Sequence, residues 1–300
     1  MASDLLPVLA SVISSLSRAG LNVVDRKQFR QEEVCPLVIG YWNNLLPVFL
    51  ILPIIIFSPS SNYLLNDISS LEIIFLALLI QWVAYSFSFA FRNLRVTDIA
   101  VLTKAADITV PFVLVMLGFY LITYSFFFLL PAILVIFICS AGMNIVKKTF
   151  KSSLVLVLAL TAQGLYSYFI GFTIYFDRDF WGLLSVAFSV LVWRFIFSSS
   201  PMLYRQRIAH LYYFPRQFLT MDGFYFRGFL TVVTQVTFIF AITANNLLAV
   251  WPILNATGCL GAVFAYFFLG EKLAPKDIIF ILFTFLISGV AVFVPNYEKL

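Results

Sequence analysis

Long apolar segments separated by short polar connections run along the whole chain. Each segment has about 20 residues or more, which is the length that an α-helix needs to cross the hydrocarbon core of a bilayer. None of the connections is long enough to form a soluble domain. The pattern therefore predicts an all-α membrane protein with ten transmembrane helices, at residues 4–24, 34–57, 71–91, 96–119, 122–145, 152–176, 181–202, 222–242, 244–270 and 274–295.

The composition indicates that lipid, rather than water, surrounds most of these segments. Hydrophobic residues make up 62% of the chain and charged residues 11%, and the mean hydropathy is +1.00. A soluble domain is about one quarter charged. The first segment starts with the acidic Asp4 and lacks a basic beginning, so we expect it to be retained as a helix and not removed as a signal peptide.

The two halves of the chain share three short motifs in the same order. The motifs are Val24-Asp25-Arg26 and Phe176-Asp177-Arg178, Pro111 and Pro252, and Ala141-Gly142 and Ser288-Gly289. Transporters are often built from such internal repeats. Ten helices divide into five and five, and an odd number of helices per half requires the second copy to insert upside down. We therefore predict two inverted five-helix repeats, at residues 1–148 and 149–300.

The basic residues lie almost entirely on one side of the predicted spans. Every connection on that side carries two or three Lys or Arg, whereas the opposite side carries only Arg178 and Lys299. Positive charge is retained on the cytoplasmic side of a membrane, so this bias predicts that both termini lie outside the cytoplasm. The same distribution accounts for the net charge of +5 without a nucleic-acid partner, since no polar segment collects the basic residues.

The last fifty residues combine a helix with a central proline, a Leu-Gly-Glu-x-Leu turn and a closing helix that ends in Gly-Val. The segments are Trp251-Pro252-Ile253-Leu254-Asn255, Gly261-Ala262-Val263-Phe264-Ala265, Phe268-Leu269-Gly270-Glu271-Lys272-Leu273 and Ser288-Gly289-Val290. This pattern resembles the EamA domain of the drug/metabolite transporter superfamily, and a weaker copy lies around Val110-Pro111 and Ala141-Gly142.

The resemblance implies a carrier built from two five-helix repeats. Substrates of this superfamily include sugars, amino acids, nucleotide derivatives, phosphorylated metabolites and drugs, so the resemblance does not select a substrate. It also implies cytoplasmic termini, which is opposite to the orientation that the charge bias predicts. The connection at residues 58–70, typically basic in the family, has no Lys or Arg here.

A stripe of small residues at helical spacing marks the ninth predicted helix. It consists of Gly258, Gly261, Ala262 and Ala265. Small residues let membrane helices approach closely, so we favour a packing role over a direct role in substrate binding. Glu271 follows this helix, and we expect it to have a structural role in the turn.

Basic residues inside the predicted helices are candidates for a binding site. An ionisable group near the bilayer centre costs on the order of 3 kcal/mol, so it normally faces a cavity or a partner. Lys104 lies deepest, and Asp107 follows three residues later on the same helical face, where the two would form a substrate site or an internal ion pair. Arg194 lies mid-helix and favours a cavity, while Arg18 would either line the cavity or reach the interface. Arg227, near a helix end, is the weakest candidate.

Polar side chains elsewhere in the apolar segments complete the predicted substrate-binding site. Alignment of the two repeats through their prolines places Asn245 opposite Lys104. Such groups with aromatic neighbours are typical of small-molecule sites, although amides in apolar helices also bond neighbouring helices. The further candidates are Asn43, Asn44, Gln81, Tyr85 and Gln163, together with Gln235 and Asn255.

These residues favour a secondary transporter that moves a small anionic or carboxylate-bearing metabolite by alternating access. If most of them share one cavity, four cations against one acid leave it positive. The alternatives are a broad-specificity exporter of amphipathic or aromatic compounds and, with less support, a membrane enzyme acting on lipid-linked substrates. The sequence has no nucleophile–base constellation, metal-ligand set or Walker-type loop, and its three cysteines are far apart.

A secondary transporter implies a particular location and particular partners. We expect an integral, multi-pass protein of a bacterial inner membrane, present as a monomer or weak dimer, that is not an enzyme. Its partners are the lipid bilayer and a small-molecule substrate, and a proton is a candidate coupling ion, with Asp107 as its carrier. We expect no catalytic residue, no metal and no cofactor.

Overall fold

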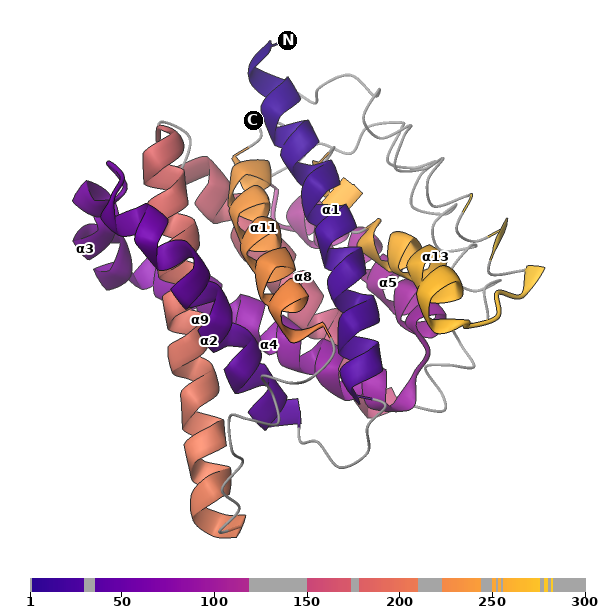
Figure 1. Cartoon of the computed structure of the whole chain (residues 1–300). Helices are drawn as coiled ribbons and strands as arrows, with labels where there is room; N and C mark the ends of the chain where they lie inside the picture. Colours follow the sequence, from indigo (N-terminus) through magenta and orange to yellow (C-terminus); the bar gives the residue numbers. More distant parts are fainter. Residues whose placement is uncertain are drawn as a thin grey trace.

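The computed structural model describes most of the predicted spans. The described residues are 2–29, 36–118, 150–173, 178–209, 223–243, 250, 251, 253, 254, 256–275, 278, 279 and 282. Within them the chain is helical and has no β-strand. The helices are α1 (Ala2–Phe29), α2 (Pro36–Ile56), α3 (Ser61–Ser69), α4 (Leu71–Asn93), α5 (Val96–Met116), α8 (Phe150–Thr173), α9 (Phe180–Ala209), α11 (Phe224–Ile242) and α13 (Thr257–Leu269) (Figure 1).

Six of these helices, α1, α2, α4, α8, α9 and α11, are long and apolar enough to cross a membrane. Many large apolar side chains are exposed on the outside of the bundle, as expected where lipid replaces water. The prediction of an all-helical chain with membrane-length helices is therefore confirmed for the described residues. The predicted helix at 122–145, and nearly all of the one at 274–295, lie outside the described residues.

Two predicted helix ends are wrong, because α1 and α9 both continue beyond them, to Phe29 and Ala209. The additional turn of α1 carries Asp25 and Arg26, which form ion pairs with Arg227 of α11 and with Glu271 after α13. Hydrophobicity alone marks these two residues as a turn. Tertiary contacts, which the local pattern does not encode, instead keep them helical.

The connection between α2 and α4, predicted as a loop, contains the short helix α3. Asp67 of α3 is buried and accepts a hydrogen bond from Nη1 of Arg178 at 2.6 Å, just before α9 begins. Trp193 Nε1 of α9 donates to the carbonyl of Ile68 at 2.8 Å. Both partners are far away in the sequence, so the residues of α3 gave little local sign of a helix.

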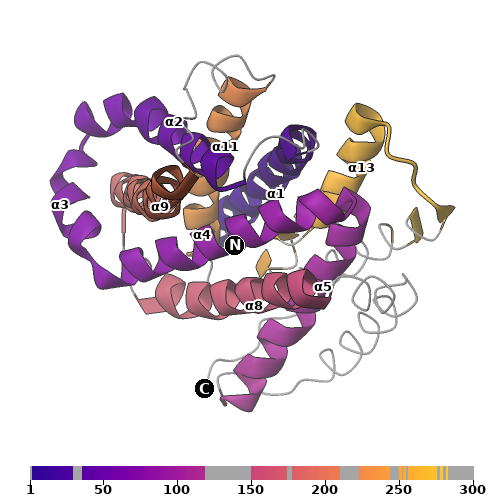
Figure 2. The same cartoon turned by 90° about the horizontal axis from the view of Figure 1, so that it is seen from below.

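Helix α9 is the most enclosed of the membrane-length helices. Helices α2, α3 and α4 form a curved wall around it (Figure 2). Helix α1 packs against α11 and α13, while α8 packs against α4 and α5. The remaining large contacts join α5 to α13 and α2 to α11.

Helix α13 lies close against its neighbours through its small residues. A Cβ added at Gly258 would lie 2.7 Å from Thr103 Oγ1 and 2.8 Å from the Cα of Ala100. A Cβ at Gly261 would lie 3.3 Å from Nδ2 of Asn22. All four members of the predicted small-residue stripe are buried, which supports their expected packing role.

The turn after α13 positions the buried carboxylate of Glu271. Gly270 has a φ of +63°, which allows the N–H of Glu271 to turn back and donate to the carbonyl of Ala265 at 3.2 Å. The carboxylate then accepts a hydrogen bond from the N–H of Val96 at 3.2 Å and lies 3.4 Å from Nε of Arg26. This residue therefore joins α1, α5 and α13, in agreement with its expected structural role.

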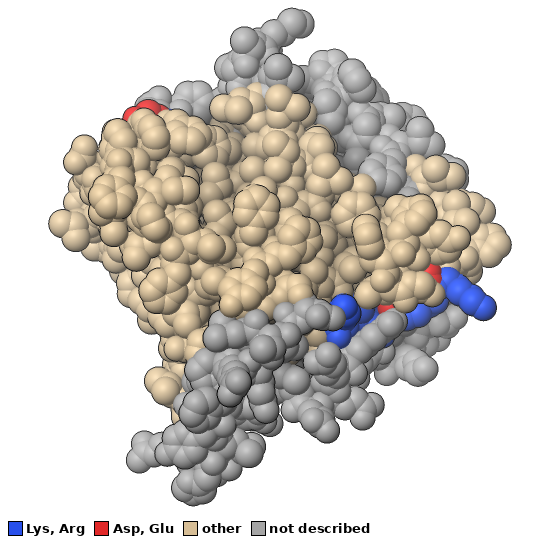
Figure 3. Space-filling model, in the orientation of Figure 1, with Lys and Arg blue, Asp and Glu red and all other residues tan. Residues whose placement is uncertain are grey.

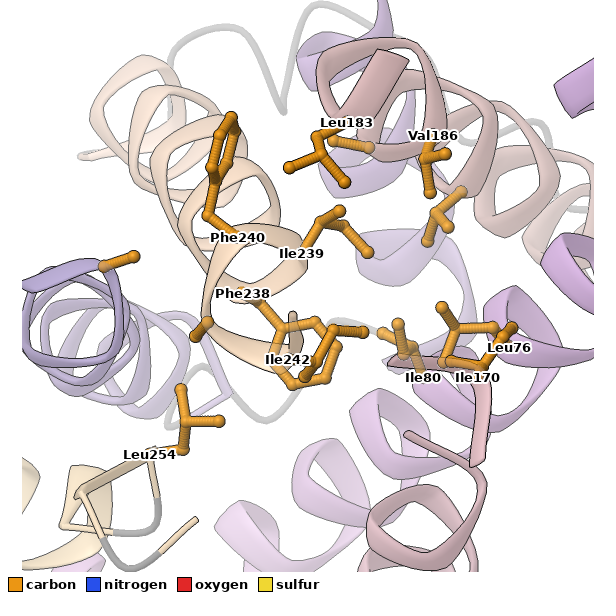
Figure 4. Close-up of a cluster of buried hydrophobic side chains, with 14 of the residues drawn as sticks. Leu76, Ile80, Ile170, Leu183, Val186, Phe238, Ile239, Phe240, Ile242 and Leu254 are labelled. Carbon is orange, nitrogen blue, oxygen red and sulfur yellow. The ribbon is translucent and has the colours of Figure 1, made fainter. Parts of the chain in front are cut away.

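An apolar cluster fills the end of the bundle at which α1, α4 and α9 begin and α8 and α11 end (Figure 4). Its buried members include Leu76, Ile170, Leu183, Ile239 and Ile242. These side chains come from four different helices and pack against one another, so this end of the bundle has an apolar core.

The opposite end of the bundle is basic. The exposed Lys27, Arg95 and Lys272 lie near the end of α1, the start of α5 and the turn after α13. In Figure 3 the visible Lys and Arg lie together at the lower right with acidic residues beside them, and most of the described surface above them is uncharged. The bundle therefore has a basic end and an end filled by apolar side chains.

Candidate functional site

A cavity of about 90 Å³ lies between α1, α4, α8, α9 and α11. Arg18, Gln163, Arg194 and Gln235 line it, and each of these residues lies near the middle of its helix. Three arginines and one aspartate contribute to the lining, so the cavity is positively charged. Its polar lining residues are Arg18, Asn22, Asp25, Gln163, Arg194, Arg227, Thr231, Thr234 and Gln235.

Arg194 of α9 is buried and is held by amide groups. Its Nε donates to Oε1 of Gln81 at 3.4 Å, and its Nη1 donates to Oε1 of Gln235 at 3.1 Å. Asn44 Nδ2 donates to the same oxygen of Gln81 at 3.0 Å. Amide oxygens orient a guanidinium but do not neutralise it, and none of the described carboxylates lies within ion-pair distance of Arg194.

Arg18 of α1 provides a second cation without a counter-ion. Its guanidinium carbon lies 5.3 Å from the ring centroid of Phe238 in α11, a cation–π arrangement. In the described part of the chain, Arg18 has no carboxylate partner and no hydrogen bond from its side chain. The charge of this arginine is therefore available to a ligand in the cavity.

Arg227 differs from these two arginines because Asp25 neutralises it. Its Nε and Nη2 donate to the two carboxylate oxygens of Asp25 at 2.5 Å and 3.2 Å. Its Nη1 lies 3.4 Å from the carbonyl oxygen of Asn43, whose own Nδ2 donates to Oε1 of Gln28 at 3.3 Å. This pair lines the side of the cavity toward the basic end and joins α1, α2 and α11.

Three buried polar atoms in the cavity wall have no hydrogen-bond partner among the described residues. They are Oε1 of Gln163, Nε2 of Gln235 and Oγ1 of Thr234. Because Oε1 of Gln235 accepts from Arg194, the Nε2 group must point elsewhere. A buried polar atom without a partner costs about 1–3 kcal/mol, and such atoms are expected where a ligand or water completes the bonding.

The structure brings several predicted site residues together. Arg18, Arg194 and Gln163 line the cavity, and Gln81 and Asn44 form the layer behind Arg194. Asn43 lies behind the paired Arg227 in the same way. Tyr85 lies one turn beyond Gln81 on α4, where its ring faces Gly40 of α2 and is not part of the cavity lining.

Three predicted residues lie wholly or partly outside the described residues. Asn245 lies outside the described residues, as do the side chains of Lys104 and Asp107, although the backbone of both belongs to α5. Their place in a binding site stays a prediction.

Asp25, Asn22 and Thr234 were missed, and Arg227 and Gln235 were ranked too low. Arg18, Asn22 and Asp25 follow one another at intervals of four and three residues, which places them on one face of a helix. This spacing could have identified Asn22 and Asp25 had α1 been predicted at its full length.

No protein-family model matches the chain, and no curated protein matches it in sequence. The chain is similar in fold to solved structures. One of them, described only as the crystal structure of a protein, matches with a TM-score of 0.64 over 98% of this chain and 98% of that chain, at 8% sequence identity. At such a low identity the likeness concerns the fold alone, and it extends over nearly the whole of both chains.

Proposed function

We propose that the chain is a secondary transporter that carries a small anion across a membrane by alternating access. The observation that carries this proposal is the positive cavity in the middle of the bundle, in which Arg18 and Arg194 have no carboxylate partner among the described residues. A buried cation without a counter-ion is unfavourable. An anionic substrate would neutralise it at the depth where carriers bind their substrates.

The packing of the helices supports an inverted-repeat architecture of two halves. If α1, α2, α4 and α5 are exchanged for α8, α9, α11 and α13, the contacts of the bundle exchange with them. The contact of α1 with α11 becomes that of α8 with α4, and the contact of α1 with α13 becomes that of α8 with α5. The contact of α2 with α11 likewise becomes that of α9 with α4. We infer ten spans in two such halves, residues 1–148 and 149–300, that move around the cavity.

The resemblance to the EamA domain favours the same conclusion. In the Leu269-Gly270-Glu271 turn of this chain, Gly270 has the left-handed backbone conformation that glycine adopts more easily than other residues. Lys104, Asp107 and Asn245 extend the proposed site toward α5 and its counterpart in the second half. Asp107 remains the candidate carrier of a coupling proton, and a bacterial inner membrane is the proposed location.

Counterflow into proteoliposomes tests the proposal. The purified chain is reconstituted into vesicles loaded with an unlabelled compound, and accumulation of the labelled compound is measured for glycolate, propionate, phosphate and the aromatic cation tetraphenylphosphonium. We expect accumulation of at least one anion above that in protein-free vesicles. Accumulation of tetraphenylphosphonium alone would replace the anion carrier by an exporter of aromatic compounds, and accumulation of none of the four would contradict the proposal.

A further inference from the structure

The size of the cavity limits what can bind at its polar centre. Its volume of about 90 Å³ is smaller than the cavity of roughly 150 Å³ that accommodates benzene. The part of a ligand that lies within it is therefore smaller than benzene. The polar centre therefore suits small organic acids better than sugars, nucleotides or aromatic compounds.

The charges of the cavity select a carboxylate and disfavour an ammonium group. Arg194 uses Nε and Nη1 to contact amide oxygens, which leaves N–H groups of Nη2 for a ligand, and Arg18 donates no hydrogen bond to a described residue. Guanidinium groups and carboxylates form strong charge-assisted hydrogen bonds. The one acidic group in the lining, Asp25, is already bound through both oxygens by Arg227, so the ammonium group of an amino acid would have no free carboxylate partner there.

The unsatisfied atoms of the wall call for a group that both donates and accepts hydrogen bonds. Oε1 of Gln163 needs a donor, whereas Nε2 of Gln235 needs an acceptor, and Oγ1 of Thr234 can take either role. A hydroxyl group is able both to donate to such an oxygen and to accept from such an N–H group. A carboxylate only accepts, and a methyl group does neither.

We propose that the cavity binds a two- or three-carbon 2-hydroxycarboxylate, with its carboxylate on Arg18 and Arg194 and its hydroxyl on Gln163, Gln235 and Thr234. This inference rests on the proposed carrier function and deepens it, because it names the chemical class of the substrate. The three side chains around the hydroxyl would then distinguish a hydroxy acid from an unsubstituted acid of the same shape.

Three acids of nearly equal shape test this inference. Glycolate, propionate and glycine each consist of a carboxylate on a CH₂ group that carries a hydroxyl, a methyl or an ammonium. Their dissociation constants are measured by titration calorimetry on the full chain in detergent. We expect glycolate to bind at least about tenfold more tightly than propionate, because propionate leaves the buried polar atoms unpaired, and more tightly than glycine.

A matched pair of variants on α11 tests whether the cavity wall causes the preference for glycolate over propionate. Thr234→Val removes the unpaired hydroxyl of the lining, whereas Thr237→Val removes a hydroxyl that donates to Val233 O in its own helix at 2.7 Å and does not line the cavity. We expect Thr234→Val to weaken glycolate binding several-fold and to leave propionate unchanged, and Thr237→Val to change neither. Gln163→Leu provides a second test of the same kind on α8.

The outcomes separate this inference from the carrier proposal. Equal dissociation constants for glycolate and propionate, or tightest binding of glycine, would overturn the hydroxy-acid inference. A glycolate preference that persists unchanged in both Thr234→Val and Gln163→Leu would also overturn it. In each case, counterflow of any small anion would leave the carrier proposal standing, whereas the absence of all anion counterflow would remove that proposal as well.

Discussion

Buried and partly buried arginines at two levels of the bundle have different partners. Toward the basic end, Arg227 pairs with Asp25 of α1, and Arg26 pairs with Glu271 of the turn after α13. In the middle, Arg18 lies over an aromatic ring and Arg194 donates to amide oxygens, and no carboxylate of the described residues lies within ion-pair distance of either. The first two arginines are neutralised by carboxylates and join parts of the bundle, whereas no described carboxylate neutralises the other two.

Substitutions at the two kinds of arginine site should therefore differ in their effects on stability and on ligand binding. Removal of one partner from a buried ion pair leaves an uncompensated charge and destabilises the fold strongly. Replacement of an unpaired cation by an apolar side chain removes an unfavourable buried charge, so it should reduce binding without destabilising the protein. Functional sites commonly show this trade-off.

The largest loss of stability is expected for Asp25→Asn. The substitution leaves Arg227 buried without a counter-ion, so the free energy of unfolding should fall by about 3 kcal/mol. Unfolding by titration with sodium dodecyl sulfate in mixed micelles measures this change. An unchanged unfolding midpoint would show that the pair does not stabilise the bundle.

A smaller loss is expected for Glu271→Gln. The amide still accepts the hydrogen bond from Val96, and Arg26 keeps its second contact, with the carbonyl of Phe91. We therefore expect a decrease of about 1 kcal/mol in the free energy of unfolding, measured by the same titration. A loss as large as that of Asp25→Asn would mean that this longer pair is the stronger one.

Asp98→Asn should have almost no effect. Its partner Arg95 lies within the same helix end and has a side chain that is 47% exposed. Exposed pairs of this kind contribute less than about 0.5 kcal/mol. The variant also serves as the control for the two buried pairs, and a decrease similar to theirs would remove the distinction between buried and exposed pairs.

Arg18→Met should separate stability from binding. We expect the free energy of unfolding to stay within about 0.5 kcal/mol of the wild-type value or to rise, because the side chain loses only its contact with Phe238. Glycolate binding, followed by calorimetry, should weaken at the same time. A clear loss of stability would indicate that Arg18 stabilises the fold, as Arg227 does.

The positions of the helices could be predicted from the sequence because long apolar runs leave few alternatives in a membrane. The starts of α4, α5 and α11 were predicted to within two residues. The end of α1 could not be predicted, since Asp25 and Arg26 stay helical through ion pairs with α11 and the turn after α13. Such partners lie far away along the chain and have no local signature.

The candidate site was predictable to the extent that burial of a charge is costly. Arg194 was identified because a cation in the middle of an apolar helix requires a special environment. Asp25 was not, because a charged residue at the edge of an apolar run is indistinguishable from a turn residue. Gln235 and Thr234 become significant only through the hydrogen bonds that they lack, and sequence does not record these.

We propose that the unpaired arginines of the cavity bind the transported anion. The most direct test compares counterflow of labelled glycolate, propionate and phosphate by Arg194→Met with that by Arg95→Met, which removes the same group from an exposed position. We expect Arg194→Met to reduce uptake of the transported anion by at least about tenfold while the protein remains folded, and Arg95→Met to retain it. Equal uptake by the two variants would contradict the account.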